Sequence, residues 1–172
     1  MMRSWSQRLA MTASRVNSEA LRTRALALLT RRDLSRAELL AKLQVSASDV
    51  QDLLDELQER GWQDDARVVE IELRAAHSKG HGVLRLRQRL QQRGIATAMI
   101  ETALATWSQD QVQPIELLRQ RFAATALADD KSRARLLRFL VYRGYSQSQA
   151  YAAVRAFLQE RRGSAAGSAT SA

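Results

Sequence analysis

Apolar residues recur along this chain at intervals of three and four positions, the spacing that places them on one face of an α-helix. Val50, Leu53, Leu54 and Leu57 form one such stripe. Similar segments follow each other along most of the chain. We expect helices at about 18–32, 35–43, 48–60, 64–78, 83–93, 97–107, from 114 onward, at 130–143 and at 146–161.

Residues that favour helix termini stand at the boundaries of these segments. Ser35 and Glu38 have the spacing of a capping box, in which hydroxyl and carboxylate satisfy free backbone N–H groups. Pro114 suits a first turn, where its missing N–H costs nothing. Further N-cap candidates are Ser46 or Ser48, Asp64 with Asp65, Asp129 or Asp130, and Ser146. Gly61, Gly94 and Gly144 are expected to end helices, because glycine tolerates the left-handed conformation found there.

A sequence echo with a period of about fifty residues indicates how the helices are grouped. The segment Leu90–Ile95 returns as Leu140–Tyr145, and Ile100, Leu104 and Trp107 return as Ala150, Val154 and Phe157. Units of this length are too small to bury their apolar faces alone, so they stack. The expected fold class is all-α, with three tandem three-helix repeats in an elongated, curved array.

The predicted organisation has five parts. We expect a basic, flexible N-terminal extension at 1–17, a neutral to acidic repeat at 18–61, basic repeats at 62–110 and 111–162, and a disordered tail at 163–172. Aromatic residues recur near helix ends, and we interpret them as packing anchors between repeats: Trp62, Trp107 and Phe157. With 7 Gly and 1 Pro in 172 residues, the composition also favours helices over strands.

Charge is distributed unevenly along the chain. Residues 1–72 contain 11 Lys and Arg against 12 Asp and Glu, whereas 73–172 contain 16 against 6. No acidic residue occurs between Leu73 and Ile100, or between Lys131 and Gln159. Clustered positive charge attracts a polyanion, and nucleic acid is the usual one. The alternative is that these cations only keep the protein soluble.

The segment at 130–143 carries the clearest candidate site. At 100° per residue, Lys131, Arg135, Arg138 and Tyr142 share a stripe about 60° wide. Cations one turn apart can meet successive phosphates, and the tyrosine ring can cover a sugar or base. Leu136, Leu137, Phe139, Leu140 and Val141 are expected to face the core. Arg133 lies among them, so we expect it to pair with a carboxylate between helices.

Other arginines are weaker candidates for the same interface. In the segment at 83–93, Arg85 and Arg89 lie opposite the apolar face and Arg93 lies at its edge. Arg87 is expected to extend over the core. Three further arginines flank the first helix break, where nearby acids could neutralise them: Arg31, Arg32 and Arg36.

Signs of catalytic or metal chemistry are weak in this sequence. It has no cysteine, which is compatible with a reducing cytoplasm, and no apolar run long enough to cross a membrane. Asp64 and Asp65 are interpreted as helix-capping residues rather than a carboxylate pair for catalysis. His77 and His81 lack a third ligand and are interrupted by Gly80. We expect neither an enzyme nor a metal or cofactor.

Several of these segments resemble the RecX family of bacterial regulators of the RecA recombinase. The segment Gly61–Val68 is similar to the family's Gly-aromatic-x-Asp-Asp-x-Arg-Phe signature, with Val68 in place of Phe. Other matching blocks are Leu28–Leu39, Gly80–Leu86, Leu90–Ile95 and Phe139–Ser146, which includes Arg143. The chain departs from the family at Val83, where Pro is usual, and at Arg89, where an acidic residue is common.

We expect a cytoplasmic monomer, and the resemblance implies that it docks in the groove of a RecA–DNA filament. There it would oppose filament growth and lower ATP hydrolysis, strand exchange and co-protease activity. The expected partners are then RecA and the DNA backbone, with Arg143 added to the contact residues, and no membrane. Two alternatives stay open on the residues alone: a general nucleic-acid-binding repeat protein, and a helical adaptor that binds only proteins.

Overall fold

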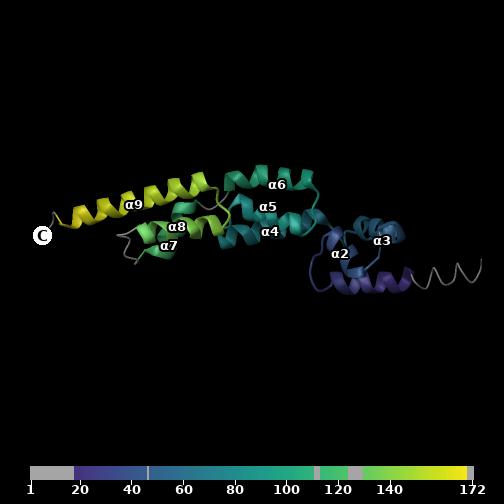
Figure 1. Cartoon of the computed structure of the whole chain (residues 1–172). Coiled ribbons are helices and arrows are strands. Elements are labelled where there is room, and N and C mark those ends of the chain that lie inside the picture. Colours follow the sequence, from purple (N-terminus) through teal and green to yellow (C-terminus); the bar gives the residue numbers. More distant parts are fainter. Residues whose placement is uncertain (1–17, 46, 111–112, 124–129, 170–172) are drawn as a thin grey trace, which may run out of the picture. The chain divides into compact units, whose positions relative to one another are not determined.

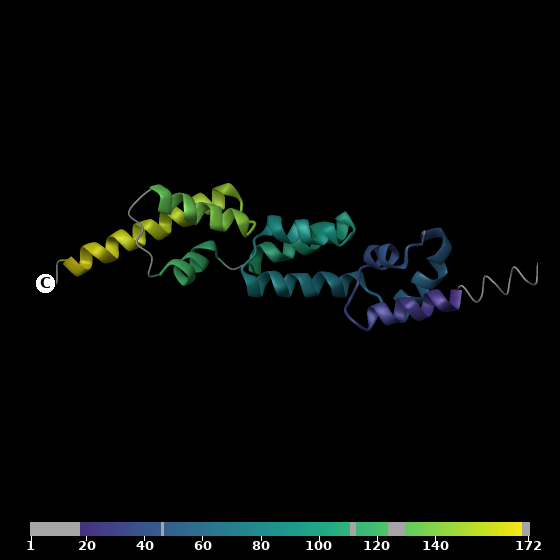
Figure 2. The ribbon, with the colours of Figure 1, turned by 60° about the horizontal axis from the view of Figure 1, so that its bottom comes forward.

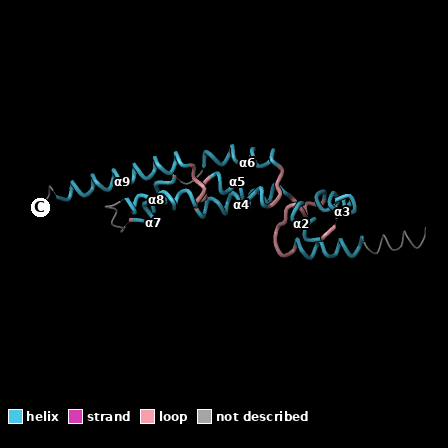
Figure 3. Tube along the Cα trace, in the orientation of Figure 1, coloured by secondary structure: helices cyan, strands magenta, loops and turns pink. Residues whose placement is uncertain are grey.

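The computed structural model of the protein describes residues 18–45, 47–110, 113–123 and 130–169 (Figure 1). All regular secondary structure in these ranges is helical (Figure 3). A first helix covers 18–29. It is followed by α2 (Arg36–Leu43), α3 (Ala47–Glu59), α4 (Asp65–Lys79), α5 (Val83–Gln92), α6 (Thr97–Asp110), α7 (Pro114–Phe122), α8 (Asp130–Tyr142) and α9 (Gln147–Ala169). The all-α, three-helix repeat class expected from the sequence is therefore confirmed.

The helix termini follow the predicted capping chemistry at most positions. Ser35 caps α2 in a full capping box with Glu38. Ser146 and Gln149 form the same reciprocal pair at α9, with bonds of 3.2 and 3.0 Å. Pro114 occupies the first turn of α7. The candidate caps Ser46 and Asp129 lie outside the described residues.

Three helix boundaries differ from the sequence prediction, one of them at the end of α6, which continues to Asp110 rather than 107. The first helix ends at 29 rather than 32, because a turn leads into the cap at Ser35. At the other end α9 continues to Ala169, although a disordered tail was expected from 163. Several alanines in this tail favour helix more than any other residue does. The tail was predicted to be disordered because its small residues have nothing to bury, but helix propensity does not depend on burial.

The chain packs as two compact units, which divide the middle repeat between them. Of the described residues, one unit contains those in 18–70 and 91–99, and the other contains those in 71–90 and 100–169. The first has a core of Ala25, Leu34, Leu39, Leu43, Val50, Leu54 and Leu57. In the second, α7 and α8 both pack on α9, which Figures 1 and 2 show beside them in yellow. Its core contains Leu117, Leu118, Phe122, Leu136, Leu140, Tyr145, Ala150, Ala153, Val154 and Phe157.

Within the first unit, the turn that follows α5 packs on the N-terminus of α2 in the preceding repeat. This turn, which we call a corner, is formed by Arg93 and Gly94, and Gly94 has φ +70°. The hydroxyl of Ser35 donates a hydrogen bond to the carbonyl of Arg93. A Cβ on Gly94 would collide with the Cβ of Ala37. We call this contact the first joint.

The second unit contains an equivalent contact, the second joint, between the Arg143-Gly144 corner and the N-terminus of α5. The N–H of Gly82 donates to the carbonyl of Arg143 at 2.8 Å, and that of Leu84 donates to Gly144 at 3.1 Å. These donors belong to a helix start that has no capping side chain, so the neighbouring corner satisfies them instead. The Arg143 side chain also donates to the carbonyl of Lys79. The fifty-residue echo therefore repeats a packing contact.

Glu38 lies at the centre of the first joint and is held ionised there. Burial opposes its charge, but hydrogen bonds from Arg32, Arg93 and the Ser35 N–H lower its pKa from 4.5 to about 2. Such a shift contributes stability above about pH 4.5 that is lost as the pH falls toward 2. We expect Glu38→Gln to lower the free energy of unfolding at pH 7 by about 2–3 kcal/mol.

Urea denaturation at several pH values measures this effect, and the variant should lose less stability than the parent between pH 4.5 and 2. Glu101→Gln is a suitable control, because it breaks only an exposed ion pair with Arg87. A Glu38→Gln protein as sensitive to acid as the parent would contradict the role given to Glu38.

In the part of the chain that the structure describes, no helix is both long and apolar enough to span a bilayer.

Candidate nucleic-acid interface

The four residues predicted on one stripe of α8 are all exposed: Lys131, Arg135, Arg138 and Tyr142. Among the described residues, no carboxylate forms an ion pair with any of the three cations. Arg135 lies with its guanidinium carbon 5.5 Å from the centre of the Phe122 ring, which leaves its N–H groups available. The stripe, which we call the α8 stripe, therefore presents three uncompensated cations to solvent.

Arg85 extends the α8 stripe from a different repeat. Its guanidinium carbon lies 4.8 Å from the centre of the Tyr142 ring, and its Nη1 donates to the Tyr142 carbonyl at 2.8 Å. Tyr142 remains 73% exposed, so one face of the ring supports the arginine while much of the side chain meets solvent. A cation and an aromatic ring in this arrangement suit a nucleotide, because one meets phosphate and the other stacks.

Arg89 and Arg93 do not join this surface, which corrects the prediction for α5. Arg89 donates to Glu72 at 2.7 Å, and the Glu72 side chain is only 7% exposed. Arg93 is 13% exposed and donates to Glu38 at 2.8 Å and to the Asp33 carbonyl at 2.8 Å. A buried carboxylate requires a cationic partner, so both arginines are held by packing between helices.

The remaining predicted arginines also divide by their partners. Arg143 bonds to the Lys79 carbonyl and lies over the Phe139 ring, so it belongs to the second joint. Arg32 pairs with Glu38 and Arg36 with Asp55, as nearby acids made possible. Arg31 is exposed, and its assignment as a contact residue stays a prediction.

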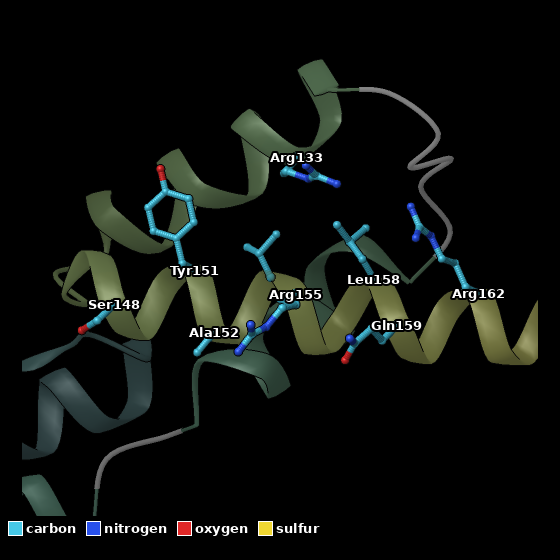
Figure 4. Close-up of a pocket in the computed structure, with 9 residues that line it drawn as sticks. Arg133, Ser148, Tyr151, Ala152, Arg155, Leu158, Gln159 and Arg162 are labelled. Atoms are coloured by element: carbon cyan, nitrogen blue, oxygen red, sulfur yellow. The ribbon is translucent and has the colours of Figure 1, made fainter.

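Arg133 differs from its predicted role. It is exposed, and it approaches Asp130 of its own helix at 3.9 Å instead of a carboxylate on another helix. A pocket of about 510 Å³ lies along α9 beside it. Figure 4 shows Arg133 on α8 near this space, with Tyr151 and Leu158 on α9 pointing toward α8. Asp130 can approach from the previous turn, so no partner on another helix is needed.

Two further side chains expected in the core are exposed. Val141 of α8 lies on the solvent side next to Tyr142. Trp62 is 40% exposed, with the Arg60 guanidinium over its ring at 5.0 Å, so it differs from the buried Trp107 and Phe157. It follows Gly61, whose Cβ position meets no neighbouring atom, and no joint forms at that corner.

The aspartate pair and the histidines have separate structural roles. Asp64 accepts the N–H of Ala66 at 2.8 Å and so caps α4 as predicted. Asp65 accepts the N–H of Arg36 at 2.8 Å, which ties the start of α2 to that of α4. His77 packs edge-on against Trp107. Within the described ranges, no group of three or more His, Cys, Asp or Glu residues is arranged to hold a metal ion.

Helical periodicity identified the α8 stripe but missed both joints. The recurring pairs Arg93-Gly94 and Arg143-Gly144 were the available signal, but we interpreted the glycines only as helix ends and the arginines only as contact residues for a polyanion. Their partners lie 55 or more residues away in the sequence, as Glu38 and Arg93 illustrate. Only the folded chain brings such partners together.

The fold and the α8 stripe together define a class: proteins built of tandem three-helix domains that present a basic face. Residues 64–104 match the RecX second three-helix domain, and 115–154 match the RecX third three-helix domain. The chain is 38% identical over 130 residues to "Regulatory protein RecX" of Neisseria meningitidis (strain Z2491), covering 74% of this chain and 84% of that protein. The protein therefore belongs to the RecX family of regulatory proteins.

Other relatives and solved structures agree with this assignment. The "Regulatory protein RecX" of Halorhodospira halophila is 36% identical over 143 residues, which is 81% of this chain and 89% of that one. The crystal structure of RecX from Lactobacillus salivarius has a TM-score of 0.66 at 17% identity and covers 81% of this chain and 96% of its own. A second crystal structure, of a regulatory protein RecX, has a TM-score of 0.69 at 20% identity, covering 90% and 79%. At these identities the two structures support the fold alone.

Proposed function

We propose that this protein is a negative modulator of the RecA recombinase that binds in the groove of the RecA–DNA filament. The observation that carries the proposal is the α8 stripe, whose three exposed cations have no acidic partner among the described residues. Its relatives share the name of a regulatory protein. DNA inside a recombinase filament fits the exposed cations, and a regulatory role fits the name of the relatives.

In this proposal Lys131, Arg135 and Arg138 contact successive phosphates of the filament DNA. Such contacts fix position without reading sequence, as a regulator of a filament on arbitrary DNA requires. Tyr142, supported by Arg85, lies against a sugar or base at the end of the α8 stripe. Occupation of the groove then opposes extension of the filament and lowers ATP hydrolysis, strand exchange and co-protease activity.

The direct test is a titration of the protein against DNA-dependent ATP hydrolysis by purified RecA. We expect inhibition at amounts below one protein per RecA subunit, because one molecule that blocks extension affects many later subunits. The same titration with RecA omitted gives the background rate. Normal ATP hydrolysis in an excess of the protein would refute the proposal.

The same titration addresses the alternative of a general nucleic-acid-binding protein. Such a protein would bind bare DNA as tightly as RecA-coated DNA, and its binding would weaken steeply with salt. It would inhibit RecA only when it covers the DNA before RecA is added. Inhibition of preformed filaments at limiting amounts therefore favours the recombinase modulator.

A further inference from the structure

A second basic site lies in a pocket of the unit that contains α7 to α9. It is formed by the end of α4, by α7 and by the end of α8. Three cationic side chains line it: Lys79 at the end of α4, Arg121 in α7, and Arg143 directly after α8. No carboxylate is among the lining residues, which also include His77, His81, Gln120 and Tyr142. The pocket is distinct from the α8 stripe, with which it shares only Tyr142.

The lining groups are hydrogen-bond donors of the type that holds a phosphate. Lys79 and Arg121 are exposed, and they form no ion pair with a described residue. Three of the last four carbonyls of α4, which would repel an anion, accept hydrogen bonds from neighbouring groups. The His77 carbonyl accepts from Gly80, that of Ala76 accepts from His81, and that of Lys79 accepts from Arg143. The positive side chains therefore determine the field of the pocket.

His81 adds a polar ring to the same pocket. The residue lines the pocket and is 9% exposed, and its ring forms no hydrogen bond with a described residue. A ring N–H is therefore available to a ligand in the pocket. Burial first, and then the charges of Arg85, Arg143, Arg89 and Lys79, lower the pKa of His81 from 6.5 to about 4. At pH 7 the His81 ring is therefore neutral, and it can donate one N–H to an anion.

We propose that this pocket binds a phosphate group, held by Lys79, Arg121 and Arg143, with His81 as a further donor. The inference goes beyond the proposed function, which depends on the α8 stripe. The phosphate can belong to a nucleic-acid backbone or to a free nucleotide, because the pocket chemistry recognises the anion itself. Because a bound phosphate favours the protonated form of His81, binding is coupled to proton uptake in the acidic range where this ring titrates.

The test uses the full chain and pyrophosphate as the probe. We expect saturable binding at pH 7, and Lys79→Gln or Arg121→Gln should each weaken it roughly tenfold, as loss of one charge-assisted hydrogen bond predicts. Arg155→Gln is the matched control, since Arg155 is also exposed but lines a different pocket. It should change the affinity less than about twofold, because a distant surface charge is screened by salt.

A second readout follows the His81 ring by nuclear magnetic resonance, with His77→Gln used to assign its signals. Bound pyrophosphate should raise the pKa of His81 by about one unit or more from its value of about 4. A pKa that does not move, or no saturation by about 1 mM pyrophosphate, would overturn the proposal. So would an equal loss of affinity in Arg155→Gln.

Two additional titrations identify the source of the phosphate. If the site holds a nucleic-acid backbone, pyrophosphate should displace a DNA oligonucleotide, and Arg121→Gln should weaken DNA binding. If it holds a free nucleotide, ATP and the oligonucleotide should bind together. Either result supports the phosphate site. A protein with Lys131, Arg135 and Arg138 replaced should still bind pyrophosphate. Loss of pyrophosphate binding therefore tests the pocket, and loss of RecA inhibition tests the proposed function of the α8 stripe.

Discussion

Replacing Lys131, Arg135 and Arg138 together by Ala should weaken DNA binding by about 10- to 100-fold at physiological salt and leave the helical content unchanged. All three side chains are exposed, and their loss removes no hydrogen bond or ion pair to a described residue, although Arg135 loses its contact with the Phe122 ring. Each lost phosphate contact reduces the magnitude of the slope of log K against log salt by about 0.9. In the triple variant the magnitude of this slope should therefore fall by about 2–3. Fluorescence anisotropy over a salt series measures both quantities.

The chain offers a control with the same change in charge. Lys42, Arg155 and Arg162 are exposed, and they too form no ion pair with a described residue. Replacing them by Ala removes one lysine and two arginines from positions outside the α8 stripe. If this control loses as much affinity as the first variant, the protein binds DNA through its total charge, and the α8 stripe has no special role.

Gly144→Ala should lower the free energy of unfolding by about 3–5 kcal/mol, the largest effect on stability that we expect from one substitution. Gly144 has φ +88°, which strains any other residue. A Cβ at this position would also collide with the backbone N and the Cβ of Arg85 in the second joint. Separation of the two elements would break the bonds from Gly82 and Leu84 to the corner. Urea denaturation measures the loss.

Gly61→Ala separates the backbone strain from the collision. Gly61 also has a left-handed conformation, with φ +67°, but a Cβ there would meet no atom within 4 Å. Its substitution should therefore cost only about 1 kcal/mol. Equal losses in Gly61→Ala and Gly144→Ala would mean that the second joint adds nothing to stability.

Local chemistry explains why the helices and their ends were predictable. The capping box of Ser35 and Glu38 involves residues three positions apart, and Pro114 starts the helix in which it lies. Such short-range patterns can be recognised in the sequence itself. The same holds for the α8 stripe, because helical periodicity alone brings Lys131, Arg135 and Arg138 to one side. Nothing distant is needed to decide where these side chains point.

The roles of the other arginines depend on distant partners, so the sequence could not determine them. Arg89 lies on the polar side of α5, but Glu72 of α4 reaches it from 17 residues away. Arg93 was expected at the edge of a basic face, yet Glu38 and Asp33 hold it from 55 and 60 residues away. A helical projection separates buried from exposed directions. It does not show which polar direction faces a neighbouring carboxylate.

The second joint relies largely on main-chain atoms: N–H groups of Gly82 and Leu84, and carbonyls of Arg143, Gly144 and Lys79. Main-chain groups are the same whatever side chain a residue carries. Mutation can therefore alter most side chains around this contact while the docking geometry persists, provided that the glycines keep the approach open. A duplicated ancestor could diverge in this way until only a few arginines and glycines still record that its parts were once alike.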